Sequence, residues 1–254
     1  MSAYSFEEAF DMTGKVVLVT GGAGGIGEAI AMAFAARGAR LVLVGRSDRV
    51  MKLAEALPGA GHLGITADIS VRGEPERAMD LVRERCGRLD VLVNNAGISA
   101  LEWAEKFDDD DWDRIMAVNL SGAFRMARAA FPLLRDSGGG RIVNMASQAA
   151  TVALEKHVAY CTSKAGMLGM TNVLAAEWAK YGIGVVAISP TVVETELARW
   201  AWAGEVGEAM KRKIPMGRFA QPEEIAMAVV YLACGAANMI TGANLVIDGG
   251  YTVI

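Results

Sequence analysis

The sequence is short of the residues from which disulfide frameworks and metal centres are built. Only three of its 254 residues are cysteine and only two are histidine. Cys86, Cys161 and Cys234 are widely spaced and form no Cys-x-x-Cys pair, so we expect free thiols in a reducing compartment. His62 and His157 are too few for a histidine-rich metal site. We therefore expect neither a disulfide-stapled protein nor a bound metal.

An excess of basic residues is also missing. Lys and Arg number 25 against 29 Asp and Glu, which gives a formal net charge of -4 and a pI near 5.4. Phosphate backbones require a concentrated basic face, so we expect no nucleic-acid partner. The one short basic stretch, at 211–213, has glutamates nearby and is interpreted as a solvated helix end.

No apolar run is both long and unbroken. The most apolar late stretch, 225–247, is interrupted by Gly235, Asn238, Gly242 and Asn244, which indicates a buried helix followed by a buried strand. The N-terminal stretch carries acids and no long apolar segment, so it is not typical of a secretory signal. We therefore expect a cytoplasmic protein without membrane attachment.

Short apolar runs that alternate with longer helical patterns are abundant. The runs are continuous rather than alternating, which is typical of strands covered on both faces. The predicted strands are 15–20, 40–45, 63–66, 90–95, 141–146, 184–189 and 244–248, and the predicted helices are 25–37, 47–57, 73–86, 111–135, 158–181 and 221–234. This order predicts an α/β fold with a single Rossmann-type, doubly wound, parallel seven-stranded sheet and helices on both faces. Because no linker divides the chain, we expect one domain over 1–254.

The segment 194–215 departs from this rhythm. It follows a strand end and contains two tryptophans and two glycines: Trp200, Trp202, Gly204 and Gly207. Ligands of doubly wound sheets bind outside the carboxyl ends of the strands. We therefore predict a mobile substrate lid at 194–215. The alternative is a helix that packs on a neighbouring subunit.

The first predicted strand runs directly into a glycine-rich turn and an alanine-rich helix. The turn is formed by Gly21, Gly24, Gly25, Ile26 and Gly27. Glycines let the backbone approach a pyrophosphate, whose charge is favoured at the N-terminus of the following helix. A turn of this kind at the first strand-to-helix junction predicts a dinucleotide cofactor.

The end of the second predicted strand bears on which cofactor binds. An NAD site places an acid on the ribose hydroxyls about 20 residues after the glycine turn, whereas this strand tip has none and is followed by Arg46. A guanidinium suits the 2′-phosphate of NADP, which we therefore favour. Asp48 weakens this prediction. NAD is the alternative if Arg46 stacks on the adenine or faces solvent.

Two further strand ends supply candidate cofactor contacts. Asp68 and Ile69 follow the third predicted strand, where they are expected beside the adenine ring. The fourth strand ends in two amides and a small-residue turn: Asn94, Asn95, Ala96 and Gly97. The amides are expected to tie adjacent strands together, while the glycine leaves room for the cofactor. A purely structural role for Asn94 is an equal alternative.

Four polar residues are candidates for the reaction itself. Tyr160 and Lys164 are four residues apart in a helical stretch, so they share a face. The pKa of a free phenol is about 10, and a nearby ammonium is expected to lower it. Ser147 follows the strand 141–146, where its hydroxyl can polarise a carbonyl oxygen. The amide of Asn119 is expected to bind water and connect Lys164 to solvent.

Taken together, in order and spacing, these motifs resemble the short-chain dehydrogenase/reductase family from about residue 15 to the C-terminus. The matching pieces are the glycine turn, Asp68, 94–97, Asn119, Ser147, Tyr160 and Lys164. The resemblance implies a catalytic tetrad of Asn119, Ser147, Tyr160 and Lys164. It implies that Tyr160 is the general acid/base, that Ser147 positions the substrate oxygen and that Lys164 also holds the nicotinamide ribose. Asn119 would support a proton relay, and the protein would be a homotetramer.

The chain departs from the family after the strand 184–189. Family members usually have Pro-Gly there, whereas this chain has Pro190 followed by Thr191. By position, the cofactor residues are still expected to include Pro190, with the Val193 backbone and the Thr195 hydroxyl at the nicotinamide carboxamide. Threonine resists positive φ, which puts the local backbone and the lid hinge in doubt.

The resemblance also places the substrate pocket. By position it is lined by Ser99, Ser147, Gln148, Ala149, Leu154, His157, Tyr160 and Trp200. Gln148 and His157 either bond substrate hydroxyls or cap local backbone. A mixed polar and aromatic pocket suits a sugar alcohol and its ketose, and the C-terminal 248–254 is similar to the ending of polyol-oxidising members. We therefore expect interconversion of a secondary alcohol and a ketone.

Two other functions remain open. A 3-oxoacyl thioester reductase would need a basic docking patch for an acidic carrier protein, for which Arg125, Arg128 and Arg135 are candidates. From a different class, the chain would be a non-catalytic NAD(P)-sensing protein. The complete tetrad argues against a sensor.

Overall fold

A parallel sheet forms the centre of the computed structural model, which describes residues 5–253 apart from the side chains of Phe6, Leu197, Trp200 and Ala201. Within that range the sheet has seven strands in the order β3-β2-β1-β4-β5-β6-β7, and all neighbours are parallel. The strands are β1 (Val16–Thr20), β2 (Arg40–Gly45), β3 (Leu63–Thr66), β4 (Val91–Asn94), β5 (Gly140–Met145), β6 (Ile183–Pro190) and β7 (Asn244–Ile247). The predicted fold class is confirmed.

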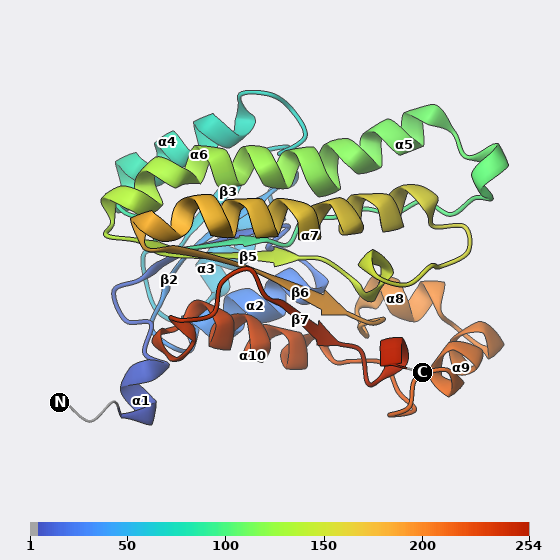
Figure 1. Cartoon of the computed structure of the whole chain (residues 1–254). Helices are drawn as coiled ribbons and strands as arrows, with labels where there is room; N and C mark the ends of the chain where they lie inside the picture. Colours follow the sequence, from blue (N-terminus) through green and yellow to red (C-terminus); the bar gives the residue numbers. More distant parts are fainter. Residues whose placement is uncertain (1–4, 254) are drawn as a thin grey trace.

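Helices cover both faces of the sheet (Figure 1). One face carries α4 (Glu74–Cys86), α6 (Ala123–Asp136) and α7 (Val158–Trp178). The other carries α2 (Gly25–Ala35), α3 (Arg49–Ala56) and α10 (Pro222–Ala233). A short helix α1 (Phe6–Ala9) precedes β1. This double covering explains why the strands are continuous apolar runs.

Successive residues of a strand belong to different cores. In β1, Val17 and Val19 pack with Phe34 of α2, whereas Val16 and Leu18 face the core below α4 and α6. Every residue of β1, β4 and β6 is buried. Because side chains alternate between the two faces, each strand binds both helical layers to the sheet.

Two helical regions differ from the sequence prediction. The predicted helix 111–135 consists of α5 (Asp109–Met116), the π-helical segment η2 (Ala117–Gly122) and α6. The predicted lid contains two short helices, α8 (Glu196–Ala201) and α9 (Glu205–Arg212). A π-helical turn changes backbone hydrogen bonding while the apolar pattern stays helical, which explains why the pattern did not separate α5 from α6.

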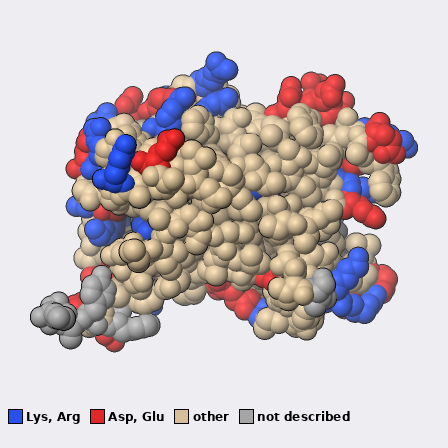
Figure 2. Space-filling model, in the orientation of Figure 1, with Lys and Arg blue, Asp and Glu red and all other residues tan. Residues whose placement is uncertain are grey.

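Charged residues are mixed in sign on the face seen in Figure 2, where they lie around the rim of a broad uncharged centre. No concentrated basic surface is visible on this face. In the described part of the chain, no helix has the length and apolarity needed to cross a membrane. Within the same residues, no group of three or more potential metal ligands comes together.

Candidate active site

The predicted site residues gather at the carboxyl ends of the central strands. β1 has β2 on one side and β4 on the other, and successive strands proceed outward in opposite directions from there. Such a switch point leaves a crevice in which doubly wound proteins bind ligands. The glycine turn follows β1, 95–97 follow β4, and Ser147 follows β5.

The glycine turn is packed too closely for side chains. Gly21 has φ +62°, in the left-handed region that favours glycine. A Cβ atom on Gly27, in the first turn of α2, would lie 2.2 Å from the Gly21 carbonyl oxygen and 2.8 Å from Asn95 Nδ2. The start of α2 therefore rests directly on the turn, whose backbone is left free to approach a pyrophosphate.

Two amides at the end of β4 hold the strand ends together, as expected. Asn95 Nδ2 donates to the carbonyl oxygens of Thr20 (3.0 Å) and Gly21 (3.2 Å). Thr20 Oγ1 accepts hydrogen bonds from the backbone N–H groups of Asn95 and Ala96. Asn94 Nδ2 donates to Asn144 Oδ1 on β5, whereas Asn94 Oδ1 has no hydrogen-bond partner among the described residues.

A cavity of about 160 Å³ begins at the glycine turn and follows the strand ends. It is lined by Gly21, Val44, Gly45, Arg46, Ala67, Asp68, Ile69, Ala96, Gly97, Ile98 and Val118. The cofactor residues predicted on four separate strand ends thus share one cleft. The cleft adjoins the close-packed turn, so a dinucleotide with its pyrophosphate at the turn would extend along these strand ends.

Three polar residues near this cleft have distinct surroundings. The Asp68 carboxylate accepts hydrogen bonds from the Ser70 N–H and hydroxyl, so it also orders its own loop. Arg46 is exposed at the tip of β2. Asp48, which was expected to weaken a phosphate site, pairs with Lys52 at 3.2 Å.

Tyr160 and Lys164 lie on one face of α7, beside the end of β5. Lys164 is 3% exposed, and its Nζ donates to the Met145 carbonyl oxygen at 2.6 Å. The same ammonium lies 5.6 Å from the centre of the Tyr160 ring. Ser147 caps the short turn η3 (Gln148–Ala150) and lies near enough to Tyr160 to lower the pKa of its phenol. The serine, tyrosine and lysine of the predicted tetrad are therefore brought together.

The pKa of the Tyr160 phenol differs in direction from the sequence prediction. Burial raises it above its ordinary value of 10.0, while the hydrogen bond with Ser147 offsets part of the rise. Burial also lowers the pKa of Lys164 from 10.5 to about 8. The expected lowering by the ammonium is not found because desolvation dominates at both groups.

The Asn119 amide is hydrogen-bonded to protein groups through both its oxygen and its nitrogen. It lies in η2 and is fully buried. Its Oδ1 accepts from the Ile98 N–H (2.8 Å), and its Nδ2 donates to the Ile98 carbonyl oxygen (2.9 Å) and to Ser163 Oγ (3.1 Å). A Cβ on Gly97 would lie 3.5 Å from both Asn119 Oδ1 and Lys164 Nζ. Asn119 thus fixes the loop after β4 alongside the lysine.

The backbone after β6 is not strained by the threonine that replaces glycine. Among the described residues, the one non-glycine at positive φ is Lys156, so Thr191 is not in that region. Val193 pairs with Ala220 in an isolated bridge. Thr195 Oγ1 accepts from the Ala198 N–H and caps α8, so its hydroxyl already has a protein partner.

Three of the predicted substrate residues differ in their surroundings. Gln148 is 2% exposed, and its Oε1 has no hydrogen-bond partner among the described residues. The His157 ring stands edge-on to the Tyr160 ring at 6.1 Å, and its Nδ1 hydrogen-bonds with the Glu155 carbonyl oxygen, as the capping alternative expected. The side chain of Trp200 lies outside the described residues.

One aromatic–cation pair near the site was not foreseen. Lys156 Nζ lies 5.0 Å from the centre of the Trp103 ring, and the Lys156 carbonyl oxygen accepts from the Glu102 N–H. These contacts join the loops that follow β4 and β5. No motif marks either residue in the sequence, because the pairing depends on how the two loops meet.

Comparison with known proteins adds independent support. A family model described as "Enoyl-(Acyl carrier protein) reductase" matches residues 21–252. A D-threitol dehydrogenase of Mycolicibacterium smegmatis is 52% identical over 247 residues, which is 96% of this chain and 95% of the relative. An NAD-dependent glycerol dehydrogenase of Listeria innocua is 47% identical over 253 residues, covering 100% of both chains. The chain belongs to the short-chain dehydrogenase/reductase family.

A solved member of this dehydrogenase family has the same fold. The gluconate 5-dehydrogenase of Burkholderia cenocepacia, in complex with NADP and tartrate, is 31% identical and superimposes with a TM-score of 0.93 over 98% of this chain and 100% of its own. The protein is therefore an NAD(P)-dependent short-chain dehydrogenase/reductase that acts on alcohols.

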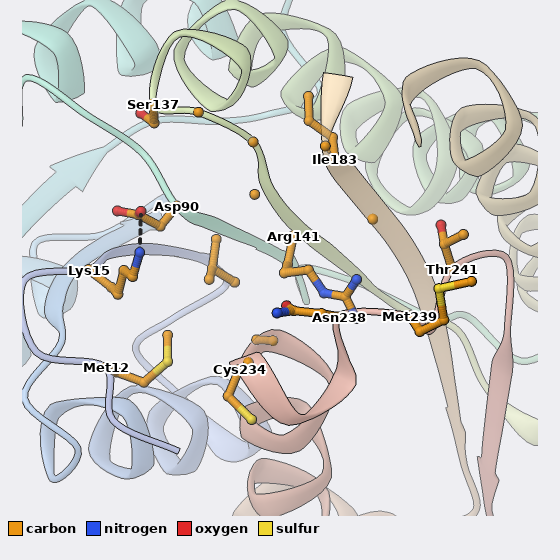
Figure 3. A pocket seen from close by; sticks show the side chains of 18 of the residues that line it. Met12, Lys15, Asp90, Ser137, Arg141, Ile183, Cys234, Asn238, Met239 and Thr241 are labelled. Atoms are coloured by element: carbon orange, nitrogen blue, oxygen red, sulfur yellow. Dashed lines mark hydrogen bonds and ion pairs between the residues drawn. The ribbon is translucent and has the colours of Figure 1, made fainter. Parts of the chain in front are cut away.

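A larger cavity of about 680 Å³ in this dehydrogenase lies at the opposite end of the strands, where they begin (Figure 3). Lys15 and Asp90 form an ion pair on one side of it, at 3.3 Å. The buried Arg141 donates to the carbonyl oxygens of Leu232 and Ala237, near the C-terminus of α10. A cation there stabilises the helix end. None of the predicted catalytic or cofactor residues lines this cavity.

Proposed function

We propose that this dehydrogenase interconverts a polyol and its ketose at Ser147 and Tyr160. The observation that carries the proposal is the meeting of Ser147, Tyr160 and Lys164 next to Gly97, which lines the cofactor cleft. The names of the threitol and glycerol dehydrogenases support a polyol substrate.

Ser147, Tyr160 and Lys164 have separate roles in the proposed reaction. When bound, the nicotinamide supplies or accepts the hydride. During oxidation, Ser147 hydrogen-bonds the substrate oxygen, and the ionised Tyr160 takes the hydroxyl proton as the carbon loses its hydride. In reduction, the Tyr160 hydroxyl returns that proton to the carbonyl oxygen. Lys164 holds the nicotinamide ribose beside the phenol.

Asn119 acts through the backbone in this scheme. It bonds both polar backbone groups of Ile98, the residue after Gly97, while Nδ2 also reaches Ser163 on α7. These bonds hold the β4 loop at a constant distance from the lysine-bearing helix. Asn119 is therefore a positioning residue whose loss would loosen the nicotinamide side of the cleft.

For the cofactor, we infer a preference for NADP(H) with Arg46 on its 2′-phosphate. The guanidinium lines the cleft at the tip of β2, and the neighbouring Asp48 is partly neutralised by Lys52. The Listeria relative is named NAD-dependent, whereas the Burkholderia structure holds NADP. Arg46→Ala should weaken NADP binding and leave NAD binding much less affected, and equal losses would refute the assignment.

The segment 194–215 serves as the substrate lid in this proposal. Its base touches the cofactor turn, since a Cβ on Gly25 would lie 2.9 Å from Thr195 Cγ2. Its far end rests on a small apolar cluster in which the Trp202 and Phe219 rings lie 6.1 Å apart. Closing of α8 and α9 over the cleft would exclude water from the hydride transfer.

The thioester reductase is less well supported. Its candidate docking arginines are engaged within the chain: Arg125 Nη1 donates to the Ser70 carbonyl oxygen, Arg128 pairs with Glu76 and Arg135 pairs with Asp136. A carrier protein would have to compete with these partners. A non-catalytic sensor would leave the assembled serine, tyrosine and lysine without a catalytic role.

Exposed apolar side chains support the homotetramer. They lie on α6 and α7 (Phe124 and Val173) and on α10 and β7 (Met227, Tyr231 and Val246). The free thiols of all three cysteines agree with the proposed cytoplasmic location.

A cofactor and substrate panel tests the proposed function. Each nicotinamide cofactor is mixed with polyols, ketoses, simple secondary alcohols and 3-oxoacyl thioesters, and the absorbance of the reduced nicotinamide is followed. We expect turnover with polyols and ketoses. Turnover confined to the thioesters would replace the proposal, and cofactor binding without any turnover would favour the sensor.

A further inference from the structure

Two buried oxygen atoms near the reacting serine have no hydrogen-bond partner among the described residues. They are Gln148 Oε1 and Thr191 Oγ1, on side chains whose residues are 2% and 8% exposed. A buried polar atom without a partner destabilises the folded protein, so two such atoms at neighbouring strand ends of the site require an explanation.

Both atoms lie at the same end of two adjacent strands. β5 and β6 are paired as far as Met145 and Ile188, and the Ala146 N–H donates to the Ile188 carbonyl oxygen. Gln148 comes directly after Ser147, while Thr191 follows the last residue of β6. The turn η3, which begins at Gln148, packs against β6. Gln148 is therefore the neighbour of the reacting serine, and Thr191 follows the strand that pairs with β5.

Backbone geometry does not account for the threonine. Residue 191 is outside the positive-φ region, and its N–H donates to the Ile247 carbonyl oxygen, as the N–H of most other residues would. What the side chain adds is a buried hydroxyl. Since that hydroxyl bonds nothing in the described chain, its partner is expected to come from a ligand.

We propose that Gln148 Oε1 and Thr191 Oγ1 together bind a second hydroxyl of the substrate, on the carbon next to the one that is oxidised. An amide oxygen only accepts hydrogen bonds, so the ligand must present an O–H donor. Ser147 and Tyr160 take the reacting oxygen, which leaves the neighbouring hydroxyl for this pair. The inference rests on the proposed function and assigns two residues to the second hydroxyl of its polyol substrate.

The same pair discriminates against the rival substrate. The carbonyl oxygens of a 3-oxoacyl thioester are acceptors, so they cannot satisfy Gln148 Oε1. A simple secondary alcohol likewise leaves both oxygens unpaired. Sites built to bond a substrate hydroxyl reject analogues that lack it for this reason.

The test compares a tetritol with 2-butanol, which lacks the second hydroxyl, in the holoenzyme. Thr191→Val and Gln148→Met should each lower the ratio of the two kcat/KM values, tetritol over 2-butanol, by about 5- to 150-fold. Most of the change should lie in the KM for the tetritol. Thr191→Ser keeps a hydroxyl and should retain the ratio. If 2-butanol turnover is too slow to measure, kcat/KM for the tetritol alone is compared between Thr191→Val and Thr191→Ser.

A stability measurement separates this role from a structural one. Thr191→Val removes an unpaired buried hydroxyl, so the Tm of the cofactor-free protein should rise. Thr171 is the matched control, because its Oγ1 accepts from Asn144 Nδ2 (2.9 Å) and donates to the Met167 carbonyl oxygen (2.8 Å). Thr171→Val should lower the Tm.

The outcomes are distinguishable. Wild-type turnover of polyols with an unchanged ratio in both variants would overturn this inference and leave the proposed function standing, as would a lower Tm of Thr191→Val. Wild-type turnover of thioesters or simple alcohols, but of no polyol, would instead refute the proposed function. A reduced ratio that serine restores would support the vicinal-hydroxyl site.

Discussion

At the scale of single residues, the buried Lys164 ammonium is the most unusual feature of the site. Among the described residues one acceptor, the Met145 carbonyl oxygen, replaces its hydration. Its pKa falls from 10.5 to about 8 because burial disfavours the charged form. Below pH 8 the folded protein therefore carries a desolvated charge. The buried charge lowers the stability of the folded protein. Between pH 8 and 10.5 the folded protein releases this proton while the unfolded chain still holds it, so stability rises with pH over that range.

Lys164→Met should consequently raise stability at neutral pH while turnover is lost. A fall of two to three pKa units corresponds to a stabilisation of about 3 kcal/mol at pH 7 on removal of the charge. The advantage over wild type should shrink as pH approaches 10.5. Denaturant unfolding of the cofactor-free proteins at both pH values measures this, and a pH-independent difference would contradict the assigned desolvation.

Tyr160→Phe should lower kcat by about 10²- to 10⁴-fold, because it removes the group that exchanges the proton. Cofactor binding, followed by protein fluorescence, should survive. Since burial raises the pKa of the phenol and oxidation requires its ionised form, wild-type oxidation should accelerate as pH rises. Tyr181→Phe is the control, as Tyr181 is 40% exposed and stacks edge-on with Phe131. Equal activity of both variants would eliminate Tyr160 as acid/base.

The identities of the reacting residues could be predicted, but their partners could not. Spacing predicts that Tyr160 and Lys164 share a helix face, whereas the bond from Lys164 to the Met145 carbonyl depends on where β5 ends. The hydrogen bonds of Asn119 to Ile98 similarly depend on a loop path. The opposite direction of the Tyr160 pKa shift follows from burial, which a motif does not reveal.

At the scale of elements, the strands were predictable and the irregular helices were not. β1 to β7 match the predicted runs to within one or two residues, because strands buried on both faces must be apolar throughout. The π-helical η2, which carries Asn119, lies within a stretch whose pattern predicts one continuous helix. α8 and α9 are six and eight residues long, too short for a clear period.

The contact between the glycine turn and α2 makes Gly27→Ala a sharp test of the cofactor cleft. The added methyl would lie 2.2 Å from the Gly21 carbonyl oxygen, so the turn must move. We expect a loss of about 1–3 kcal/mol in stability and weaker binding of both nicotinamide cofactors. Gly24→Ala is the matched control for folding, because its methyl meets nothing within 4 Å. The same Tm for both variants would contradict this packing.

At the scale of the whole molecule, two apolar surfaces are exposed on the single chain. Val173 on α7 is 54% exposed and Met227 on α10 is 57% exposed. Figure 2 shows an uncharged centre on the face that carries α7, α10 and β7. Exposed apolar surface of this kind is typical of subunit interfaces.

The proposed tetramer would use both surfaces. Light scattering after size exclusion should give four times the chain mass of 26.8 kDa. Val173→Asp should disrupt the interface through α7 and yield dimers, because a buried unpaired carboxylate is costly. A monomeric wild type would refute the tetramer, and a tetrameric Val173→Asp would exclude α7 from the interface.

The most direct test of the central claim is a crystal structure of the complex with NADPH and a ketose. We expect the ketose oxygen in hydrogen-bond contact with both Ser147 Oγ and the Tyr160 hydroxyl, with Lys164 on the nicotinamide ribose. The adjacent hydroxyl should face Gln148 and Thr191. A ketose bound elsewhere, or a Tyr160 side chain directed away from the nicotinamide, would contradict it.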